Sequence, residues 1–304
     1  MISRHKYKTV DWIDLELPSE EEVHQISEEF KLNPVLVGEL LKPSERTKVD
    51  RYANYMYLIL HFPKYKHGGN RDVAQEIDFI LGRNFIITSH YEPIDVFFDL
   101  SKSLETKAIL DKGEDTDNSG YIFYHIMKKL YENLEHELDH VYRDLAQAER
   151  EIFIGNELKM VQALSNINKA LIDFKRPLKM HHEILDSFDI AEEKLLGSKF
   201  NHFTEIILGE YKRVWSMLES NREVLLDLRS TNDSLFSAKT NSIMKNLTIM
   251  SFLTFPLTLM VGILDMNTAS NPLAGSQNQF WVVLSIMGAT TLIILTLFKY
   301  KRWI

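Results

Sequence analysis

Two long segments without any ionisable side chain, both near the C-terminus, constrain this sequence more than any other feature. Residues 246–264 and 266–298 contain no Asp, Glu, Lys, Arg or His, and only Asp265 separates them. Almost all of the charge therefore lies in the preceding part of the chain, and the mean hydropathy of −0.18 averages over two unlike parts. We expect a charged body that is followed by an apolar tail.

The apolar tail has the length of a membrane hairpin. Residues 246–264 and 280–298 would each form about 28 Å of helix, which is enough to cross the hydrocarbon core of a bilayer. Two buried helices of a soluble domain are the alternative, but two adjacent uncharged segments of this length favour transmembrane helices. We predict a first transmembrane helix at about 246–264, an exterior loop at 265–279, a second transmembrane helix at 280–298 and a basic tail at 299–304.

The charges beside the two spans predict their orientation. Basic residues flank the hairpin as Lys239 and Lys245 before the first span and Lys299, Lys301 and Arg302 after the second. Because the loop 265–279 has no Lys or Arg, the positive-inside rule places both termini in the cytoplasm. Trp281 and Trp303 stand at opposite ends of the second span, where aromatic side chains meet the membrane interface. We therefore expect a multi-pass protein of the cell (inner) membrane whose partner is the lipid bilayer.

The first 115 residues predict a cytoplasmic α/β domain. Alternating apolar residues at 9–18 are typical of a strand, and Ser19 with Glu22 forms a capping box that opens a helix ending near Phe30. The other elements expected here are a short helix from Asn33 and Pro34, strands at 55–62, 74–82 and 84–91 with a Gly-Arg-Asn hairpin turn between the last two, a loop at 66–72 and a helix at 93–105.

A linker of acidic and small residues at 111–120 separates this domain from a helical part. One stripe at helical spacing consists of Leu130, Leu134, Leu138, Val141 and Leu145. The pattern is interrupted at Gly155 and again at Gly197. We predict an antiparallel helical pair at 119–200 and a long stalk helix at 201–264 that continues into the first transmembrane helix.

Composition excludes several classes of protein. The N-terminal residues lack the apolar core of a signal peptide, and the absence of cysteine excludes disulfides and thiolate metal sites. A formal net charge of −8, without a basic patch among aromatic residues, argues against nucleic acid as a partner. No Ser-His-Asp or Cys-His set follows from the spacing, so we do not expect an enzyme or an organic cofactor.

One motif nevertheless has the spacing of a zinc metalloprotease. Residues 136–140 read His-Glu-Leu-Asp-His, the helical pair of zinc ligands with a general-base glutamate. However, Asp139 places a charge where such enzymes keep an uncharged residue, and no third ligand follows at a familiar short spacing. A solvated amphipathic helix explains the motif better than a membrane protease.

The first span carries polar residues along one face. They recur at steps of three or four as Asn241, Met244, Thr248, Ser251 and Thr258, with Thr254 close by. Small hydroxyl residues allow helices to pack closely, and Ser and Thr also bond back to their own helix. A third interpretation is a hydrated pore face that several copies of this helix form together. The spacing alone leaves all three interpretations open.

The segment 231–267 resembles the CorA family of divalent-cation (Mg²⁺/Co²⁺) channels. The matching residues are Lys239-Thr240-Asn241, Met244-Lys245, Leu247-Thr248, Pro256-Leu257-Thr258 and Met266-Asn267. That family ends its first span in Gly-Met-Asn and closes with a lysine-rich segment and Trp. In layout the resemblance covers the whole chain. It implies an α+β cytoplasmic domain, a long stalk helix, two C-terminal transmembrane helices and a homopentamer.

The resemblance also implies how ions pass. Family pore positions map here onto Asn241, Met244, Leu247, Ser251, Phe255 and Thr258. A ring of Asn267 at the outer mouth would bind Mg²⁺, Co²⁺ or Ni²⁺ through its water shell. Neutral oxygens suit this role because Mg²⁺ dehydrates reluctantly and conduction needs weak binding. Met244 and Leu247 would form a hydrophobic constriction.

The chain departs from the family pattern at the pore mouth. Asp265 occupies the glycine position before Met266 and Asn267. A ring of carboxylates would concentrate cations, or it would hold them too tightly to conduct. We expect a cation channel, and a non-conducting or weakly conducting membrane-anchored sensor or scaffold is the alternative. The family also implies gating by cytoplasmic Mg²⁺, for which Asp227 and Asp233 on the stalk are the candidates.

Overall fold

The computed structural model describes residues 1–304 except 45, 65–73, 111–117, 198–199, 266–278 and 302–304. The side chains of 104–110, 191–194, 264–265 and 279 are also outside the described set. The predicted loop at 66–72, most of the linker and the predicted pore residues Met266 and Asn267 therefore lie outside the described residues. Two compact units are present, Met1–Arg229 and Ser230–Ile304, and we describe each by itself.

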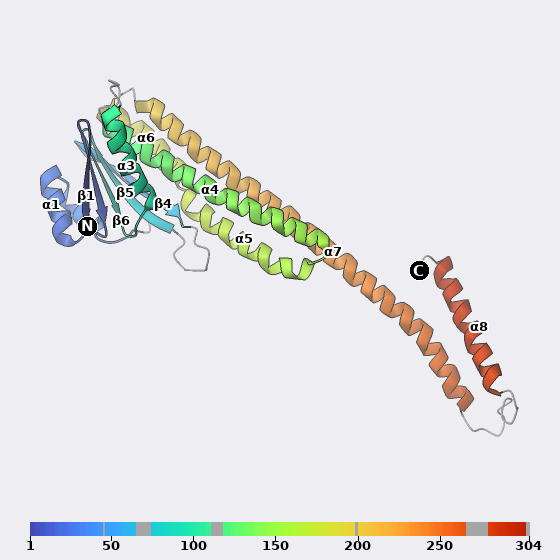
Figure 1. Cartoon of the computed structure of the whole chain (residues 1–304). Helices are drawn as coiled ribbons and strands as arrows, with labels where there is room; N and C mark the ends of the chain where they lie inside the picture. Colours follow the sequence, from blue (N-terminus) through green and yellow to red (C-terminus); the bar gives the residue numbers. More distant parts are fainter. Residues whose placement is uncertain (45, 65–73, 111–117, 198–199, 266–278, 302–304) are drawn as a thin grey trace. The chain divides into compact units, whose positions relative to one another are not determined.

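A six-stranded sheet forms the centre of the first unit (Figure 1). The strands are β1 (Ile2–Tyr7), β2 (Val10–Glu16), β3 (Lys48–Arg51), β4 (Tyr55–Pro63), β5 (Ala74–Gly82) and β6 (Phe85–His90). Their order in the sheet is β1-β2-β6-β5-β4-β3. Only β2 and β6 pair in parallel, and the other neighbours are antiparallel. The strands predicted at 55–62, 74–82 and 84–91 are confirmed, whereas β1 and β3 are edge strands that the sequence pattern does not predict.

Two short helices cover one face of the sheet. The predicted capping box is present, because Ser19 Oγ accepts from the Glu22 N–H and the Glu22 carboxylate accepts from the Ser19 N–H, and α1 (Glu20–Phe30) follows it. Asn33 caps α2 (Pro34–Glu39) with a single bond, because its Oδ1 accepts from the Val35 N–H. The buried core under these helices includes Ile13, Leu15, Val23, Ile26, Leu36, Ile59, Ile80 and Ile87. Burial of this apolar surface fixes the position of both helices on the sheet.

Longer helices cover the other face (Figure 1). They are α3 (Asp95–Leu110), α4 (Ser119–Ile154), α5 (Glu157–Leu178) and α6 (His181–Leu196). The first part of α7 (Asn201–Asp265) packs against α4, where Asn221 Nδ2 donates to the Leu138 carbonyl at 2.9 Å. A row of aromatic rings joins the sheet to the helices. The ring centroids of Phe79 of β5 and Phe123 of α4 are 5.3 Å apart, and those of Phe123 and Phe188 of α6 are 5.0 Å apart. The predicted leucine stripe of α4 is buried. Contacts thus join residues 1–229 into one unit across the predicted segments 1–115 and 119–200.

The helical pair predicted at 119–200 needs one correction. The first arm is the 36-residue helix α4, which ends at Gly155 with a φ of 100°, as the break in the sequence pattern predicts. The second arm is not one helix but is divided into α5 and α6, which meet at Lys179 and Met180. Pro177 lies in the last turn of α5, and proline cannot donate a backbone hydrogen bond there. This proline is the local signal for the division.

The second unit holds the end of α7 and the helix α8 (Gln279–Tyr300). Both helices are long and apolar enough to cross a membrane. Only 6% of the apolar window in α7 and 0% of that in α8 is buried, which disfavours the alternative of two core helices in a soluble domain. Pro256 lies inside α7 and interrupts its hydrogen-bond ladder.

Candidate functional site

The apolar part of α7 has one face that packs against α8. Thr290 of α8 contacts the Met260 sulfur at 3.8 Å, and the rings of Phe252 and Phe298 are 6.3 Å apart. The least exposed residues of this part of α7 are Thr248, Ile249, Leu253, Pro256, Leu257 and Met260, and all except Thr248 lie close to one side of the helix. Successive helical residues are about 100° apart, so the side chains other than Thr248 form a single stripe toward α8.

The residues predicted to line a pore lie on the opposite side of α7. Asn241, Met244, Leu247, Ser251, Phe255 and Thr258 are all exposed. Their steps of three and four residues centre them about 180° from the stripe that faces α8. Met244 and Leu247 are each 56% exposed and Phe255 is 73% exposed, so the face is unusually apolar for a surface. The structure therefore brings the predicted residues together on one face and leaves that face free of α8.

The hydroxyl groups of this helix donate to their own backbone. Ser251 Oγ donates to the Leu247 carbonyl at 2.9 Å, and Thr258 Oγ1 donates to the Thr254 carbonyl at 2.9 Å. Thr248 bonds to the Met244 carbonyl in the same way. This confirms the interpretation that the hydroxyls bond back to the helix. Since each hydrogen is already used, the exposed oxygens of Ser251 and Thr258 offer only lone pairs to whatever lies beside them.

The predicted pore mouth and regulatory residues are less fully described. Asp265 is the last residue of α7, while Met266 and Asn267 lie outside the described residues. Asp227 and Asp233 are both exposed on α7. Neither aspartate forms an ion pair with any residue in the described part of the chain. Their assignments remain predictions.

The His-Glu-Leu-Asp-His motif does not form a metal site among the described residues. His136 and His140 are exposed on α4, and Nδ1 of His140 instead contacts the Arg143 guanidinium at 2.9 Å. Within the described ranges no three His, Cys, Asp or Glu side chains are arranged to hold a metal ion. The protease interpretation therefore gains no support.

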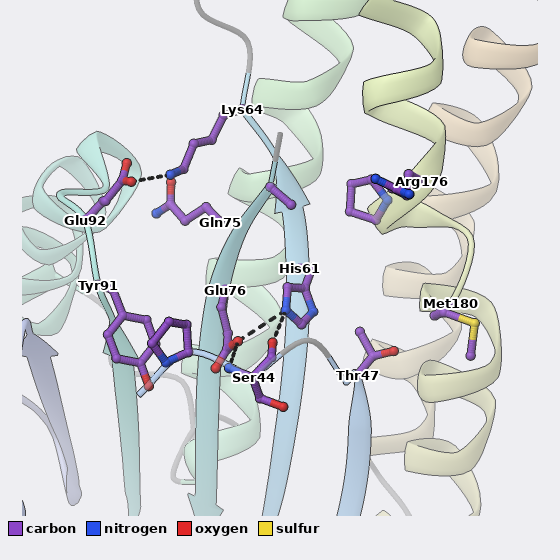
Figure 2. A pocket seen from close by; sticks show the side chains of 13 residues that line it. Ser44, Thr47, His61, Lys64, Gln75, Glu76, Tyr91, Glu92, Arg176 and Met180 are labelled. Atoms are coloured by element: carbon purple, nitrogen blue, oxygen red, sulfur yellow. Dashed lines mark hydrogen bonds and ion pairs between the residues drawn. The ribbon is translucent and has the colours of Figure 1, made fainter. Parts of the chain in front are cut away.

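A second candidate site, which the sequence does not reveal, is a cavity of about 810 Å³ in the first unit (Figure 2). On its floor, His61 Nε2 lies 2.7 Å from the Ser44 carbonyl oxygen and 3.2 Å from Glu76 Oε2. The Ser44 N–H also donates to Glu76 Oε2 at 2.6 Å. Burial lowers the pKa of His61, but the bonds to Glu76 and Ser44 outweigh it and the pKa is raised. Arg176 and Met180 line the opposite wall.

Comparison with protein families identifies the chain. The family profile described as "CorA-like Mg2+ transporter protein" matches residues 7–302, nearly the whole sequence. The chain belongs to the CorA family. CorA-family transporters are membrane proteins, and the two apolar helices α7 and α8 fit that assignment.

Individual CorA relatives are distant but match over almost the full length. The cobalt/magnesium transport protein CorA of Thermotoga maritima is 23% identical over 298 residues, which cover 97% of this chain and 84% of the relative. The protein of the same name from Methanocaldococcus jannaschii is 22% identical over 307 residues, which cover 100% of this chain and 94% of the relative.

Solved structures show that the fold is that of CorA. The complete CorA magnesium transporter from Methanocaldococcus jannaschii matches with a TM-score of 0.83 at 22% identity, over 97% of this chain and 92% of that chain. The full-length CmaX protein matches with a TM-score of 0.73 at 16% identity, over 97% of this chain and 89% of that chain. The predicted fold class, an α+β domain followed by a long helix and a C-terminal apolar helix, is confirmed.

Proposed function

We propose that the chain forms a homopentameric membrane channel for divalent cations, with Mg²⁺ as the principal ion and Co²⁺ or Ni²⁺ as further ions. The observation that carries this proposal is the exposed stripe of α7 opposite α8. A helix that packs on α8 with one face and exposes a partly polar, partly apolar face on the other is suited to lining a shared pathway. Membership of the CorA family and the names of the two CorA relatives support the same transport function.

The chemistry of the stripe suits a hydrated cation. Ser251 and Thr258 present lone pairs because their hydrogens are bonded within the helix, so they accept hydrogen bonds from the water shell of the ion. Mg²⁺ keeps its waters, and a wall of acceptors binds such an ion weakly enough to release it. Met244 and Leu247 form a hydrophobic constriction toward the cytoplasmic end. Asn267 forms the selectivity ring at the outer mouth.

Asp265 separates the proposal from its alternative. Five carboxylates at the mouth raise the local cation concentration and thereby favour entry. If they bind the ion too tightly, the protein is a membrane-anchored sensor or scaffold that conducts weakly or not at all. In both cases the termini lie in the cytoplasm, the protein lies in the inner membrane, and Mg²⁺ bound near Asp227 and Asp233 restrains the cytoplasmic end.

Ion uptake by the purified protein in liposomes tests the proposal. We expect Mg²⁺, Co²⁺ and Ni²⁺ uptake into vesicles, and a pentamer in native mass spectrometry. Ser251→Ala should reduce uptake several-fold, because it removes an acceptor from the pathway. Ser285→Ala is the matched control, since Ser285 of α8 is also exposed and its hydroxyl donates to the Trp281 carbonyl at 2.8 Å. Equal loss in both variants would contradict the pathway assignment.

Two further variants address the mouth and the gate. Asp265→Gly should change the uptake rate while the pentamer is retained, and an unchanged rate would show that Asp265 is incidental. Absence of uptake by the wild-type chain together with its recovery in Asp265→Gly would support the sensor or scaffold. Replacing both Asp227 and Asp233 by Ala should make uptake less sensitive to Mg²⁺ inside the cytoplasmic compartment. Retained inhibition would contradict their regulatory role.

A further inference from the structure

Four buried residues on one face of the sheet carry polar atoms without partners. We call Tyr57, Glu76, Asp78 and Ser89 the Asp78 cluster. The unpartnered atoms are Tyr57 Oη, Glu76 Oε1, both carboxyl oxygens of Asp78 and Ser89 Oγ; none has a hydrogen-bond partner among the described residues. Buried polar atoms are almost always bonded, so a concentration of exceptions at one place calls for a physical explanation.

The strand register explains how these side chains meet. Asp78 of β5 pairs with Ser89 of β6 and with Ile59 of β4, and paired residues of neighbouring strands point to the same face. That face is the one under α1 and α2, because Ile59 and Ile80 belong to its apolar core. Asp78 is 0% exposed. A carboxyl group has therefore been placed among aliphatic side chains.

Among the described residues Lys48 lowers the pKa of Asp78, but it does not outweigh burial and the neighbouring carboxylates. The titratable groups that face it are Glu39 of α2, Lys48 and Asp50 of β3, Tyr57 and His61 of β4, Glu76 of β5 and, just beyond β6, Tyr91. Lys48 donates to Glu39 at 2.9 Å and to Asp50 at 2.7 Å, so its charge is already paired. His61 contacts Glu76 instead. An ionised Asp78 would thus be a buried carboxylate beside two others.

The direction of the pKa agrees with this geometry. Burial raises the pKa of Asp78 well above its usual value, and the charges of Glu76 and Glu39 raise it further. The Tyr57 hydroxyl offsets part of this rise in pKa, although it does not form a hydrogen bond of normal geometry to Asp78. The neutral carboxylic acid is the form that suits the site.

Glu76 connects this carboxyl to the cavity of Figure 2. Its Oε2 accepts from the Ser44 N–H and contacts His61 Nε2, and both partners line the cavity together with Glu76 itself. Ser44 lies in the connection between α2 and β3. A movement of the Glu76 carboxylate would therefore alter its hydrogen bond to Ser44 and so affect that connection.

We propose that Asp78 is a buried proton-binding site and that Glu76 and His61 couple its proton to the Ser44 connection at the cavity. In the protonated state Asp78 is neutral and Glu76 holds Ser44. When Asp78 releases its proton to solvent, two carboxylates stand two residues apart on one face of β5. Their repulsion turns Glu76 toward the cavity and breaks its bond to the Ser44 N–H. The inference does not depend on ion transport, and a proton fits better than a metal because the described residues provide no set of three metal ligands.

The isosteric variant Asp78→Asn tests the proton directly. The full chain in detergent would be unfolded thermally at several pH values between 5 and 9. A group whose folded pKa is raised stabilises the protein at low pH and loses that contribution as pH rises toward the folded pKa. Asp78→Asn cannot lose a proton, so its melting temperature should exceed that of the wild type by a margin that grows with pH. A melting temperature lower than wild type by the same amount at every pH would overturn the proposal.

The coupling has its own measurement. Hydrogen exchange of the Ser44 amide, corrected for the intrinsic effect of pH, should accelerate at high pH in the wild type and stay slow in Asp78→Asn. Glu76→Gln should release the Ser44 amide at every pH, because an amide oxygen is a weaker acceptor than a carboxylate. Exchange at Ser44 that is identical in the wild type and Asp78→Asn would overturn the coupling. Added Mg²⁺ that raises the melting temperature of the wild type but not of Asp78→Asn would show a cation site instead of a proton site.

Discussion

His181 joins the helical layer to the sheet, and its replacement by phenylalanine has effects that the structure allows us to size. His181 Nε2 donates to the His61 carbonyl at 2.9 Å, so its Nδ1 accepts from the Tyr131 hydroxyl at 2.9 Å. The imidazole and Tyr131 are fully buried. Phenylalanine fills similar space but leaves the hydroxyl and the carbonyl without partners. Each loss costs about 1–3 kcal/mol, so we expect the free energy of unfolding at pH 7 to fall by about 2–6 kcal/mol.

The same variant also changes the response to acid. Burial lowers the pKa of His181 from 6.5 to about 4, and the nearby charge of His61 contributes to the decrease. A folded pKa below the unfolded one means that His181 contributes fully above pH 6.5 and that its contribution is lost as pH falls toward 4. That pKa difference corresponds to about 3 kcal/mol. Between pH 7 and pH 4, the free energy of unfolding of His181→Phe should therefore fall by about 3 kcal/mol less than that of the wild type.

Urea unfolding of the full chain in detergent, followed by circular dichroism at pH 7 and pH 4, measures both effects. His182→Asn is the matched control, since His182 is adjacent but about half exposed, with a surface ion pair to Asp186 and an edge contact to the Tyr211 ring. The raised pKa values of His61 and His90 act in the opposite direction, but both are present in every variant and cancel in the comparison. A His181→Phe protein that loses less than about 0.5 kcal/mol, or that keeps the acid response of the wild type, would refute the reasoning.

Three substitutions elsewhere have expected effects on the free energy of unfolding in the same assay. Ser19→Ala removes the cap that bonds Glu22 and should cost about 1 kcal/mol, and a Ser19→Asp variant should retain stability. Gly155→Ala forces a side chain into a φ of 100° and should cost about 1 kcal/mol or more, whereas a neutral effect would contradict the cap geometry. Gly120→Ala places a methyl group against the Phe200 ring and should cost about 1–3 kcal/mol, a loss that Phe200→Leu should partly relieve.

Local signals predict the fold where each element depends on its own residues. The capping box at Ser19 and the hairpin turn at Arg83 place element ends close to those observed, because both signals are short-range. The edge strands β1 and β3 escape prediction because one is rich in charged residues and the other has four residues. Their strand conformation comes from pairing with β2 and β4, which a local pattern does not contain.

The two candidate sites differ in how far the sequence can reveal them. The stripe on α7 follows helical spacing, so the positions of Ser251 and Thr258 along the chain are enough to place them on one face. The Asp78 cluster has no such signal, because the polar residues of 74–82 look like the solvent-facing half of an alternating strand. In the folded protein helices cover both faces of β5, and Glu76 and Asp78 are buried for that reason. Burial on both faces is a tertiary property that alternation cannot predict.

Pro256 makes α7 easier to bend at that residue than elsewhere in its apolar segment. Pro256 has no backbone N–H to donate to the Phe252 carbonyl. A steric clash between the proline ring and that carbonyl also pushes the two groups apart. Pro256 is on the side toward α8, so a bend away from the proline would place Ser251 and Thr258 on the inner surface of the helix. In the proposed channel, a small bend at this position would change the width of the pathway by moving only the last turns of α7 in each copy.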